Sequence, residues 1–254
     1  MIKVFVETGS LMQDEVEIVG ADARHLRLVL RKVVGDSILV GIGGATYRST
    51  ILSVLDDVVI ARLDLLIASK GESPLKTRLY QGLAKGDKFD LVVQKATELG
   101  VTEITPFTSQ YTVVQLEQKK QERRQLRWQK IAHEAAKQCK RDKIPKVNAI
   151  IDFSTMVTQL QAMDSQDMIL MPYEQASDES HFCPFSKAPR EVGLIIGPEG
   201  GFHPGEVERV REIGGQVISL GSRILRTETA ALVALTLVQY QWGDLAFQEE
   251  RVTT

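Results

Sequence analysis

The sequence has few cysteines and no long apolar run. Its two cysteines, Cys139 and Cys183, lie far apart and outside any His or Cys cluster, so neither a zinc site nor a disulfide framework is expected. We interpret both as packing residues. No stretch approaches the roughly 20 apolar residues that a membrane helix needs, and the opening MIKVFVETGS lacks the pattern of a signal peptide. We therefore expect a cytoplasmic protein without a metal.

Two familiar phosphate-binding motifs are also absent. The chain has neither G-x-G-x-x-G nor G-x-x-x-x-G-K-[ST], although residues 194–207, LIIGPEGGFHPGEV, have the composition of a ligand loop. Those motifs direct backbone N–H groups and a lysine at phosphate, whereas this loop carries the carboxylate of Glu199, which repels phosphate. The loop therefore favours a ligand that is neutral or cationic at this end, such as S-adenosylmethionine. A tight strand-to-helix turn without a ligand is the alternative.

Positive charge is concentrated in one segment. The net charge is only −2, but residues 119–146 contain eleven Lys or Arg against three acidic residues. Because phosphate binding depends on the local field, this segment can bind RNA or DNA although the whole chain is mildly acidic. A solvated helix face is the other interpretation.

The first part of the chain alternates between apolar and polar residues. Residues 1–67 contain IKVFV, SILVGI, STILSVL and VVIARLDLLI, separated by turn formers, which predicts a small antiparallel barrel or sandwich. Residues 21–32 break this alternation, because Leu26, Val29 and Leu30 recur at helical spacing. They predict a short helix with three arginines on its other faces: Arg24, Arg27 and Arg31.

The polar segment 68–76 is the predicted linker, and strand-then-helix units follow it. The helix expected around 117–140 has an apolar stripe that includes Trp128, Ala132 and Cys139. Later runs such as DMILMP, EVGLIIG and GQVISLG each end at Gly or Pro, which predicts a parallel sheet covered on both faces. Ligands bind such sheets at the carboxyl ends of the strands, here Met171-Pro172, Gly197-Pro198 and Leu220-Gly221. The closing helix 229–242 is apolar nearly all round, which suits a central position or burial against another subunit.

The glycine loop and the segment after the last strand supply the candidate site. Gly200 and Gly201 can adopt positive φ, and His203 is placed to cap a helix that begins at Pro204. In ISLGSRILRTETAALVAL, residues 218–235, Thr227 or Thr229 is a candidate helix cap. A purely structural role explains Arg226 less readily, because a guanidinium beside an apolar helix usually has an anionic partner.

These two segments resemble the signature of the RsmE family of ribosomal RNA uridine N3-methyltransferases, of the SPOUT class. The resemblance continues through HLRLVLRKVVGD, KGDKFDLVVQKATELGV, EAAKQCKRDKIP and PYE, in the family's order. It implies a PUA-like, RNA-binding β-barrel over residues 1–72 and an α/β trefoil-knot domain with a mostly parallel sheet over residues 73–254. It also implies S-adenosylmethionine as cofactor, a homodimer formed through the C-terminal domain, and 16S ribosomal RNA or the 30S subunit as partner. The chain departs from the family at Gln110 and Tyr111, where an acid and an Arg are usual, and at His203, where Ser is usual.

The implied reaction assigns roles to individual residues. Methylation of N3 of uracil requires loss of the N3 proton and stabilisation of the negative charge on O2 and O4, and we predict that Arg226 is the catalytic stabiliser. Glu199, Glu228 and water are alternative proton acceptors. The expected cofactor-binding residues are Met171, Pro172, Ile196, Gly197, Pro198, Glu199, Gly200, Gly201, Leu220, Gly221, Ile224, Leu225 and Arg226.

RNA binding is expected from two basic groups. The first is the arginine set of the barrel, and the second lies in the basic segment; together they are Arg24, Arg27, Arg31, Arg123, Arg124, Lys137 and Arg141. Two rival functions stay open. One is a methyltransferase that acts on another RNA, such as a transfer RNA, and the other is a non-catalytic RNA-binding factor of ribosome assembly.

Overall fold

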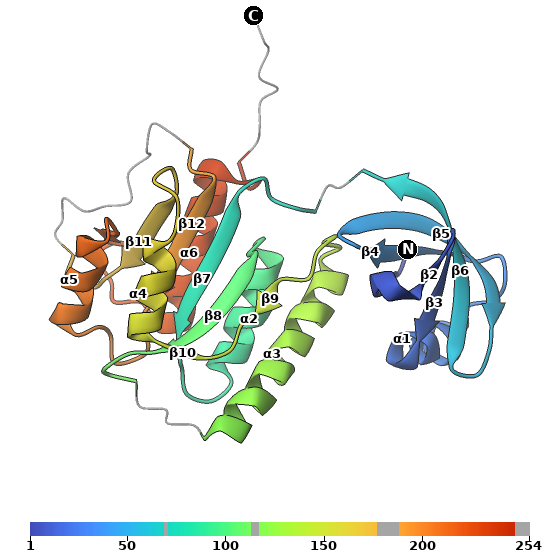
Figure 1. Cartoon of the computed structure of the whole chain (residues 1–254), viewed down its shortest axis with the longest axis horizontal. Helices are drawn as coiled ribbons and strands as arrows, with labels where there is room; N and C mark the ends of the chain where they lie inside the picture. Colours follow the sequence, from blue (N-terminus) through green and yellow to red (C-terminus); the bar gives the residue numbers. More distant parts are fainter. Residues whose placement is uncertain (69–70, 113–116, 177–187, 247–254) are drawn as a thin grey trace, which may run out of the picture. The chain divides into compact units, whose positions relative to one another are not determined.

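The computed structural model describes residues 1–68, 71–112, 117–176 and 188–246 (Figure 1). Cys183 lies outside these residues. Contacts divide the chain into two units, Met1–Glu72 with Ala136–Lys143, and Ser73–Ala135 with Ile144–Thr254. No helix within the described ranges is long and apolar enough to cross a membrane.

The first unit is built on one curved sheet. Its strands are β1 (Lys3–Phe5), β2 (Leu11–Met12), β3 (Glu15–Val19), β4 (Ser37–Ile42), β5 (Ala45–Val54) and β6 (Val58–Ile67), in the spatial order β1-β4-β5-β6-β3-β2. All neighbours are antiparallel except β1 and β4, which are parallel. Because β1 and β2 are the two ends of this order, the described strands form an open half-barrel, which agrees in part with the small antiparallel barrel or sandwich predicted.

The segment predicted as a regular amphipathic helix has a different geometry. A short α1 (Gly20–Arg24) continues into a π-helical turn, η2 (His25–Val29), and a 3-10 turn, η1 (Thr8–Ser10), precedes β2. The wider π turn rotates the side chains out of helical register. Leu26 is therefore buried as predicted, whereas Val29 is 66% and Leu30 38% exposed, so the prediction for these two residues was wrong.

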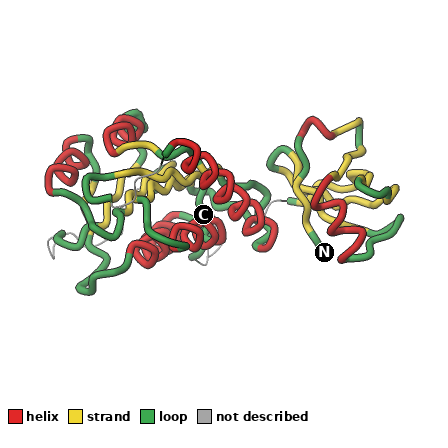
Figure 2. Tube along the Cα trace, turned by 90° about the horizontal axis from the view of Figure 1, so that it is seen from below, coloured by secondary structure: helices red, strands yellow, loops and turns green. Residues whose placement is uncertain are grey.

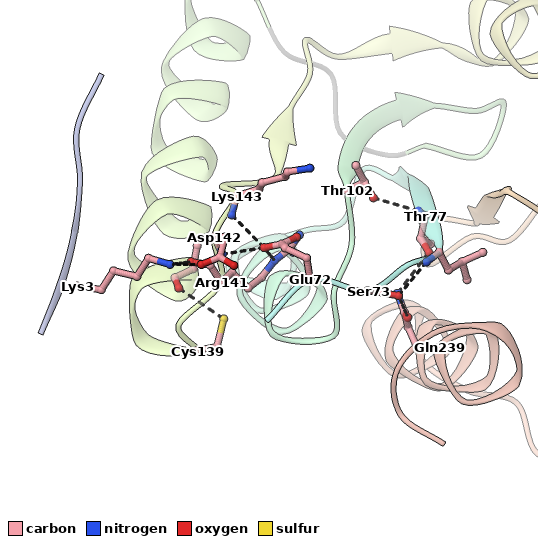
Figure 3. Close-up of polar contacts among 12 residues, drawn as sticks. Lys3, Glu72, Ser73, Thr77, Thr102, Cys139, Arg141, Asp142, Lys143 and Gln239 are labelled. Carbon is pink, nitrogen blue, oxygen red and sulfur yellow. Dashed lines mark hydrogen bonds and ion pairs between the residues drawn. The ribbon is translucent and has the colours of Figure 1, made fainter. Parts of the chain in front are cut away.

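Residues 136–143 join the first unit through a buried polar cluster. The sequence predicts them as part of the C-terminal domain, residues 73–254. The Glu72 carboxylate accepts hydrogen bonds from the Arg141 guanidinium and from the backbone N–H groups of Asp142 and Lys143, the latter two at 2.9 Å (Figure 3). Lys3 Nζ lies 2.6 Å from Asp142 Oδ1. These contacts explain why the last residues of α3 (Gln118–Gln138) and those that follow it, up to Lys143, belong to the unit that contains Glu72.

The second unit has a seven-stranded, wholly parallel sheet, which confirms the parallel sheet predicted. Its main order is β10-β8-β7-β12-β11-β13, and β9 pairs with β8. The strand bounds are β7 (Lys76–Gly82), β8 (Glu103–Thr108), β9 (Lys146–Val147), β10 (Ile151–Asp152), β11 (Met168–Pro172), β12 (Glu191–Ile196) and β13 (Gln216–Ile218). β11 lies between β12 and β13, so the three predicted strand ends are neighbours.

Helices cover both faces of this sheet, as Figure 2 shows. The core on one face includes residues of α2 (Lys88–Glu98), α3 and α6 (Thr227–Trp242), and the core on the other includes residues of α4 (Phe153–Gln161) and α5 (Pro204–Glu212). Successive strand residues alternate between these cores. In β7, for example, Leu79 faces the first core and Tyr80 the second, which is why the strands are apolar on both sides.

Candidate active site

The glycine loop connects β12 to α5 and is fixed at its far end by a capping box. His203 Nδ1 accepts a hydrogen bond from Gly205 N at 3.1 Å, and Glu206 Oε2 accepts one from His203 N at 3.0 Å. The predicted helix start is therefore confirmed. Glu206 Oε1 also accepts a bond from Gln110 N at 2.9 Å, which joins the helix start to the loop after β8.

The two central glycines are needed for different reasons. Gly201 has φ +70°, and a Cβ there would lie 2.9 Å from Glu174 Oε1. Gly200 is not among the glycines with positive φ, so it does not use this conformational freedom. A Cβ at Gly200 would instead lie 2.9 Å from both the Cβ and the carbonyl oxygen of Tyr111. Only Gly201 is required by backbone conformation, and Gly200 is required by the close approach of the loop after β8.

Glu199 anchors the loop to the start of α2. Its Oε1 accepts a hydrogen bond from Lys85 N at 3.1 Å and faces Lys88 Nζ at 2.9 Å. Burial by itself raises the pKa of this carboxyl, but the bonds from Lys88 and Lys85 outweigh that effect and hold the pKa of Glu199 below its ordinary value. Glu199 is therefore an ionised anchor, and a group with a lowered pKa is a weak proton acceptor.

A second anchor joins the glycine loop to α6. The Thr227 hydroxyl donates to the Gly197 carbonyl oxygen at 2.5 Å and accepts from Gln81 Nε2 at 2.8 Å. The end of β7 also lies close to the glycine loop. A Cβ added at Gly82 would collide with the backbone nitrogen of Pro198. Thr227 was predicted only as a helix cap. The N-cap position of α6 is Arg226, and its side chain makes no capping bond.

These segments enclose a cavity of about 410 Å³ at the carboxyl ends of β11, β12 and β13. Of the residues predicted to bind a cofactor, only Met171 does not line it, because its side chain is fully buried between sheet and helices. The predicted residues that do line it are Pro172, Ile196, Gly197, Pro198, Glu199, Gly200, Gly201, Leu220, Gly221, Ile224, Leu225 and Arg226.

The remaining lining residues were not among those predicted. They are Lys88, Tyr173, Glu174, Phe202, Arg223, Thr227 and Ala230. Some had a signal in the sequence: Tyr173 and Glu174 follow directly after a predicted strand end, and Arg223 lies between two predicted residues. Lys88 lies in the segment KGDKFDLVVQKATELGV, which carries the family resemblance, but no local pattern linked it to Glu199, with which it forms an ion pair at the cavity.

The cavity has an exposed cationic side. Arg226 is exposed and lines the cavity, and within the described part of the chain its guanidinium has no hydrogen bond or ion pair. Arg223 is likewise exposed, lines the cavity and has no hydrogen bond or ion pair among the described residues. Glu228, the other candidate proton acceptor, does not line the cavity, and its buried Oε2 has no hydrogen-bond partner among the residues described. The described residues also include no group of three or more His, Cys, Asp or Glu that could hold a metal.

The residues predicted to bind RNA divide into exposed and internally paired side chains. Arg24, Arg31 and Arg123 are exposed, and Arg124 is half-buried. Arg27 forms an ion pair with Asp56.

The last two predicted RNA contacts are engaged inside the first unit. Lys137 Nζ lies 2.5 Å from Asp22 Oδ1. The Arg141 side chain is 5% exposed and pairs with Glu72 at 2.8 Å. These two cations therefore neutralise internal carboxylates, which leaves Arg123 and Arg124 as the candidates for RNA contact on α3.

The fold and the cavity are those of an RNA methyltransferase domain, the description of the family model that matches residues 71–239. The chain is 36% identical over 251 residues to ribosomal RNA small subunit methyltransferase E of Bacillus subtilis, covering 95% of this chain and 97% of the relative. The chain belongs to this family of ribosomal RNA small subunit methyltransferases.

Solved structures agree with this assignment. The family's enzyme from Neisseria gonorrhoeae, bound to S-adenosyl methionine, is 29% identical, with TM-score 0.84 over 96% of this chain and 99% of that one. A methyltransferase from Legionella pneumophila in complex with the cofactor SAM is 30% identical, with TM-score 0.84 over 96% and 99% of the two chains. The predicted family, the enzyme class of rRNA methyltransferase and S-adenosylmethionine as the family's cofactor are thereby confirmed.

Proposed function

We propose that this chain transfers the methyl group of S-adenosylmethionine to N3 of one uridine in 16S ribosomal RNA, with the assembled 30S subunit as substrate. The observation that carries the proposal is the cavity at three neighbouring strand ends, with a fixed glycine loop on one side and Arg226 on the other, whose side chain has no partner among the residues that the structure describes. Family membership supports the RNA substrate, and the exposed Arg226 at the cavity, a cation that can stabilise an anionic uracil, supports N3 as the acceptor atom.

The cavity suits this cofactor by size and charge. Its volume of about 410 Å³ is in the range of small-molecule sites. The glycines at 200 and 201 leave no side chain between ligand and backbone, while Leu220 and Leu225 offer apolar surface to an adenine. The carboxylates of Glu199 and Glu174, which both line the cavity, suit a cationic ligand rather than a phosphate. When bound, the cofactor supplies an electrophilic methyl group on a sulfonium.

Arg226 acts on the acceptor base. The Arg226 guanidinium, which extends from the start of α6, stabilises the negative charge that spreads over O2 and O4 as N3 loses its proton. Glu199 is an unsuitable base because it is already ionised and paired with Lys88, and Glu228 lies outside the cavity. We therefore propose that the N3 proton passes to a water molecule in the cavity and from there to solvent.

The finer features of architecture and assembly are part of the same proposal. We propose that the half-barrel of the first unit is a PUA-like RNA-binding module. A trefoil knot in the C-terminal part is supported by the chain order, since β13 pairs with β11 on the side opposite β12 and the chain then continues to α6, which contacts β12. A homodimer through this part is supported by α6, where Tyr240 is 62% exposed and Val233 and Leu237 are only half-buried.

Two measurements test the function. Isothermal titration calorimetry with S-adenosylmethionine should give saturable binding, which a non-catalytic assembly factor with a relict pocket need not show. The second is mass spectrometry of nucleosides after incubation of the protein with 30S subunits, naked 16S RNA and transfer RNA, each from a strain without the gene. Appearance of 3-methyluridine in 30S subunits supports the proposal. Methylation of transfer RNA alone, or at another position of the base, contradicts it.

A further inference from the structure

Thr227 joins two walls of the cavity through buried hydrogen bonds. Its hydroxyl bridges Gln81 Nε2 at 2.8 Å and the Gly197 carbonyl oxygen at 2.5 Å. Gln81 is fully buried near the end of the central strand β7, and its Nε2 also donates to the Gly82 carbonyl oxygen at 3.1 Å. That second bond fixes the orientation of the Gln81 amide. A continuous chain of polar groups thus runs from the sheet through Thr227 to the glycine loop.

The same bonds hold the start of α6. Arg226 occupies the N-cap position, and its side chain makes no capping bond, so no local cap fixes the first turn. Thr227 is the first helical residue and is 6% exposed. Because Arg226 and Thr227 are adjacent in the backbone, the bond at the Thr227 hydroxyl also sets the point from which the Arg226 guanidinium extends along the cavity.

We propose that Thr227, oriented by Gln81, is a positioning residue that keeps Arg226 and the Gly197 carbonyl at a fixed separation during methyl transfer. The inference rests on the proposed function, in which Arg226 stabilises the anionic uracil. Catalysis by a fixed charge depends on its placement, and a displacement of about 1 Å can reduce a rate on the order of 100-fold. Removal of the hydroxyl breaks the link between the start of α6 and the glycine loop, so the backbone from which the Arg226 guanidinium extends is held less firmly.

Two variants distinguish the effect of the hydroxyl from that of the side-chain volume. Thr227→Val keeps the volume and removes the hydroxyl, and Thr227→Ser keeps the hydroxyl. We expect kcat to fall at least about tenfold in Thr227→Val and to stay within about threefold of wild type in Thr227→Ser, with the KM for RNA little changed in both. The matched control is Thr97→Val, which also removes a buried hydroxyl, one that donates to the Val93 carbonyl oxygen at 2.8 Å inside α2. The control should lower the melting temperature without lowering kcat at a temperature well below it.

Gln81→Leu provides an independent test, which also applies if Thr227→Val fails to fold. It should lower kcat and leave the KM for RNA little changed. The double variant Gln81→Leu/Thr227→Val should have a kcat no lower than that of the slower single variant. Multiplicative losses, or an unimpaired kcat in either single variant, overturn the positioning role. The wild-type protein is measured in the same assay. Its failure to methylate contradicts the proposed function, whereas normal wild-type turnover with an active Thr227→Val contradicts only the inference about Thr227.

Discussion

The carboxylate of Glu199, at the centre of the glycine loop, lies 2.9 Å from Lys88 Nζ at the start of α2. The two residues are 111 positions apart in the sequence. Together with the bond from Lys85 N, this ion pair fixes the loop against a helix that supports the sheet. The carboxylate that argued against a phosphate ligand is therefore a structural anchor for one wall of the cavity.

Glu199→Gln should weaken cofactor binding only modestly. The amide keeps the size of the side chain and an acceptor for Lys85 N, but loses the charge that faces Lys88. Because both partners are partly exposed, we expect the dissociation constant for S-adenosylmethionine to rise about two- to fivefold in calorimetry at neutral pH. Glu98→Gln, which breaks the pair with Lys95 on the same helix, is the control and should leave the constant unchanged. Loss of all binding would show that Glu199 contacts the ligand itself.

The Glu199 anchor also predicts a pH dependence of stability. Since its pKa is lowered in the folded protein, the ionised carboxylate stabilises the fold above its ordinary value of 4.5, and this contribution is lost as the pH falls through the lowered pKa. The difference in free energy of unfolding between wild type and Glu199→Gln, measured with urea, should be constant near neutrality and shrink below pH 4.5. A difference that grows on acidification would contradict the assigned direction.

Gly201→Val should abolish cofactor binding in a protein that still folds. A β-branched side chain is strained at φ +70° and meets Glu174 at the cavity wall. Gly214→Val isolates the strain, since Gly214 has φ +82° and a Cβ added there would meet no other atom within 4 Å. Both variants should lower the melting temperature, but calorimetry should detect S-adenosylmethionine binding only in the control. Equal binding by the two variants would remove Gly201 from the cofactor site.

The sequence sufficed to predict the sheet and most of the cavity because the relevant signals are local. Runs such as EVGLIIG are apolar on both faces and end at glycine, and parallel strands bring their carboxyl ends to one edge. The partners of Glu199 and Thr227 are not local. Gln81 and Thr227 are 146 positions apart, and no periodicity links them.

The sequence also did not indicate which charged side chains are buried. Arg141 lies in the strongly basic segment 119–146, where an arginine is expected to be exposed. It is buried because Glu72, which lies within the predicted linker, accepts its hydrogen bonds. The π turn after α1 is a similar case, because a one-residue change in hydrogen-bond spacing moved Val29 and Leu30 to the surface.

Arg226→Ala should reduce turnover at least about 100-fold while leaving the affinity for S-adenosylmethionine within a few-fold of wild type. The reason is that the guanidinium is assigned to the anionic uracil, where charge develops only during the reaction. Single-turnover kinetics and calorimetry measure the two quantities separately. Arg209→Ala, on the exposed face of α5, is the control and should behave as wild type. Loss of cofactor binding with an unchanged chemical step would refute the catalytic role.

Arg123→Ala and Arg124→Ala should each weaken RNA binding and reduce its salt dependence. A side chain that contacts one phosphate releases about one counterion, so the slope of log K against log salt should become less steep by roughly one per variant. Filter binding of 16S RNA fragments over a range of salt concentrations measures this slope. Arg211→Ala, which removes a cation paired with Glu208 on α5, should leave it unchanged. An unchanged slope for both α3 variants would remove α3 from the RNA surface.

Glu72→Ala should strongly destabilise the protein. The substitution leaves the Arg141 guanidinium, which is 5% exposed, without its carboxylate, and it removes the acceptor for the N–H groups of Asp142 and Lys143. Breaking a buried pair in this way costs about 3–5 kcal/mol, whereas Glu17→Ala, at an exposed position of β3, should change stability by less than about 0.5 kcal/mol. Urea unfolding measures both. If Glu72→Ala were as mild as the control, the cluster would not hold residues 136–143 in the first unit, and Arg141 would again be a candidate for RNA contact.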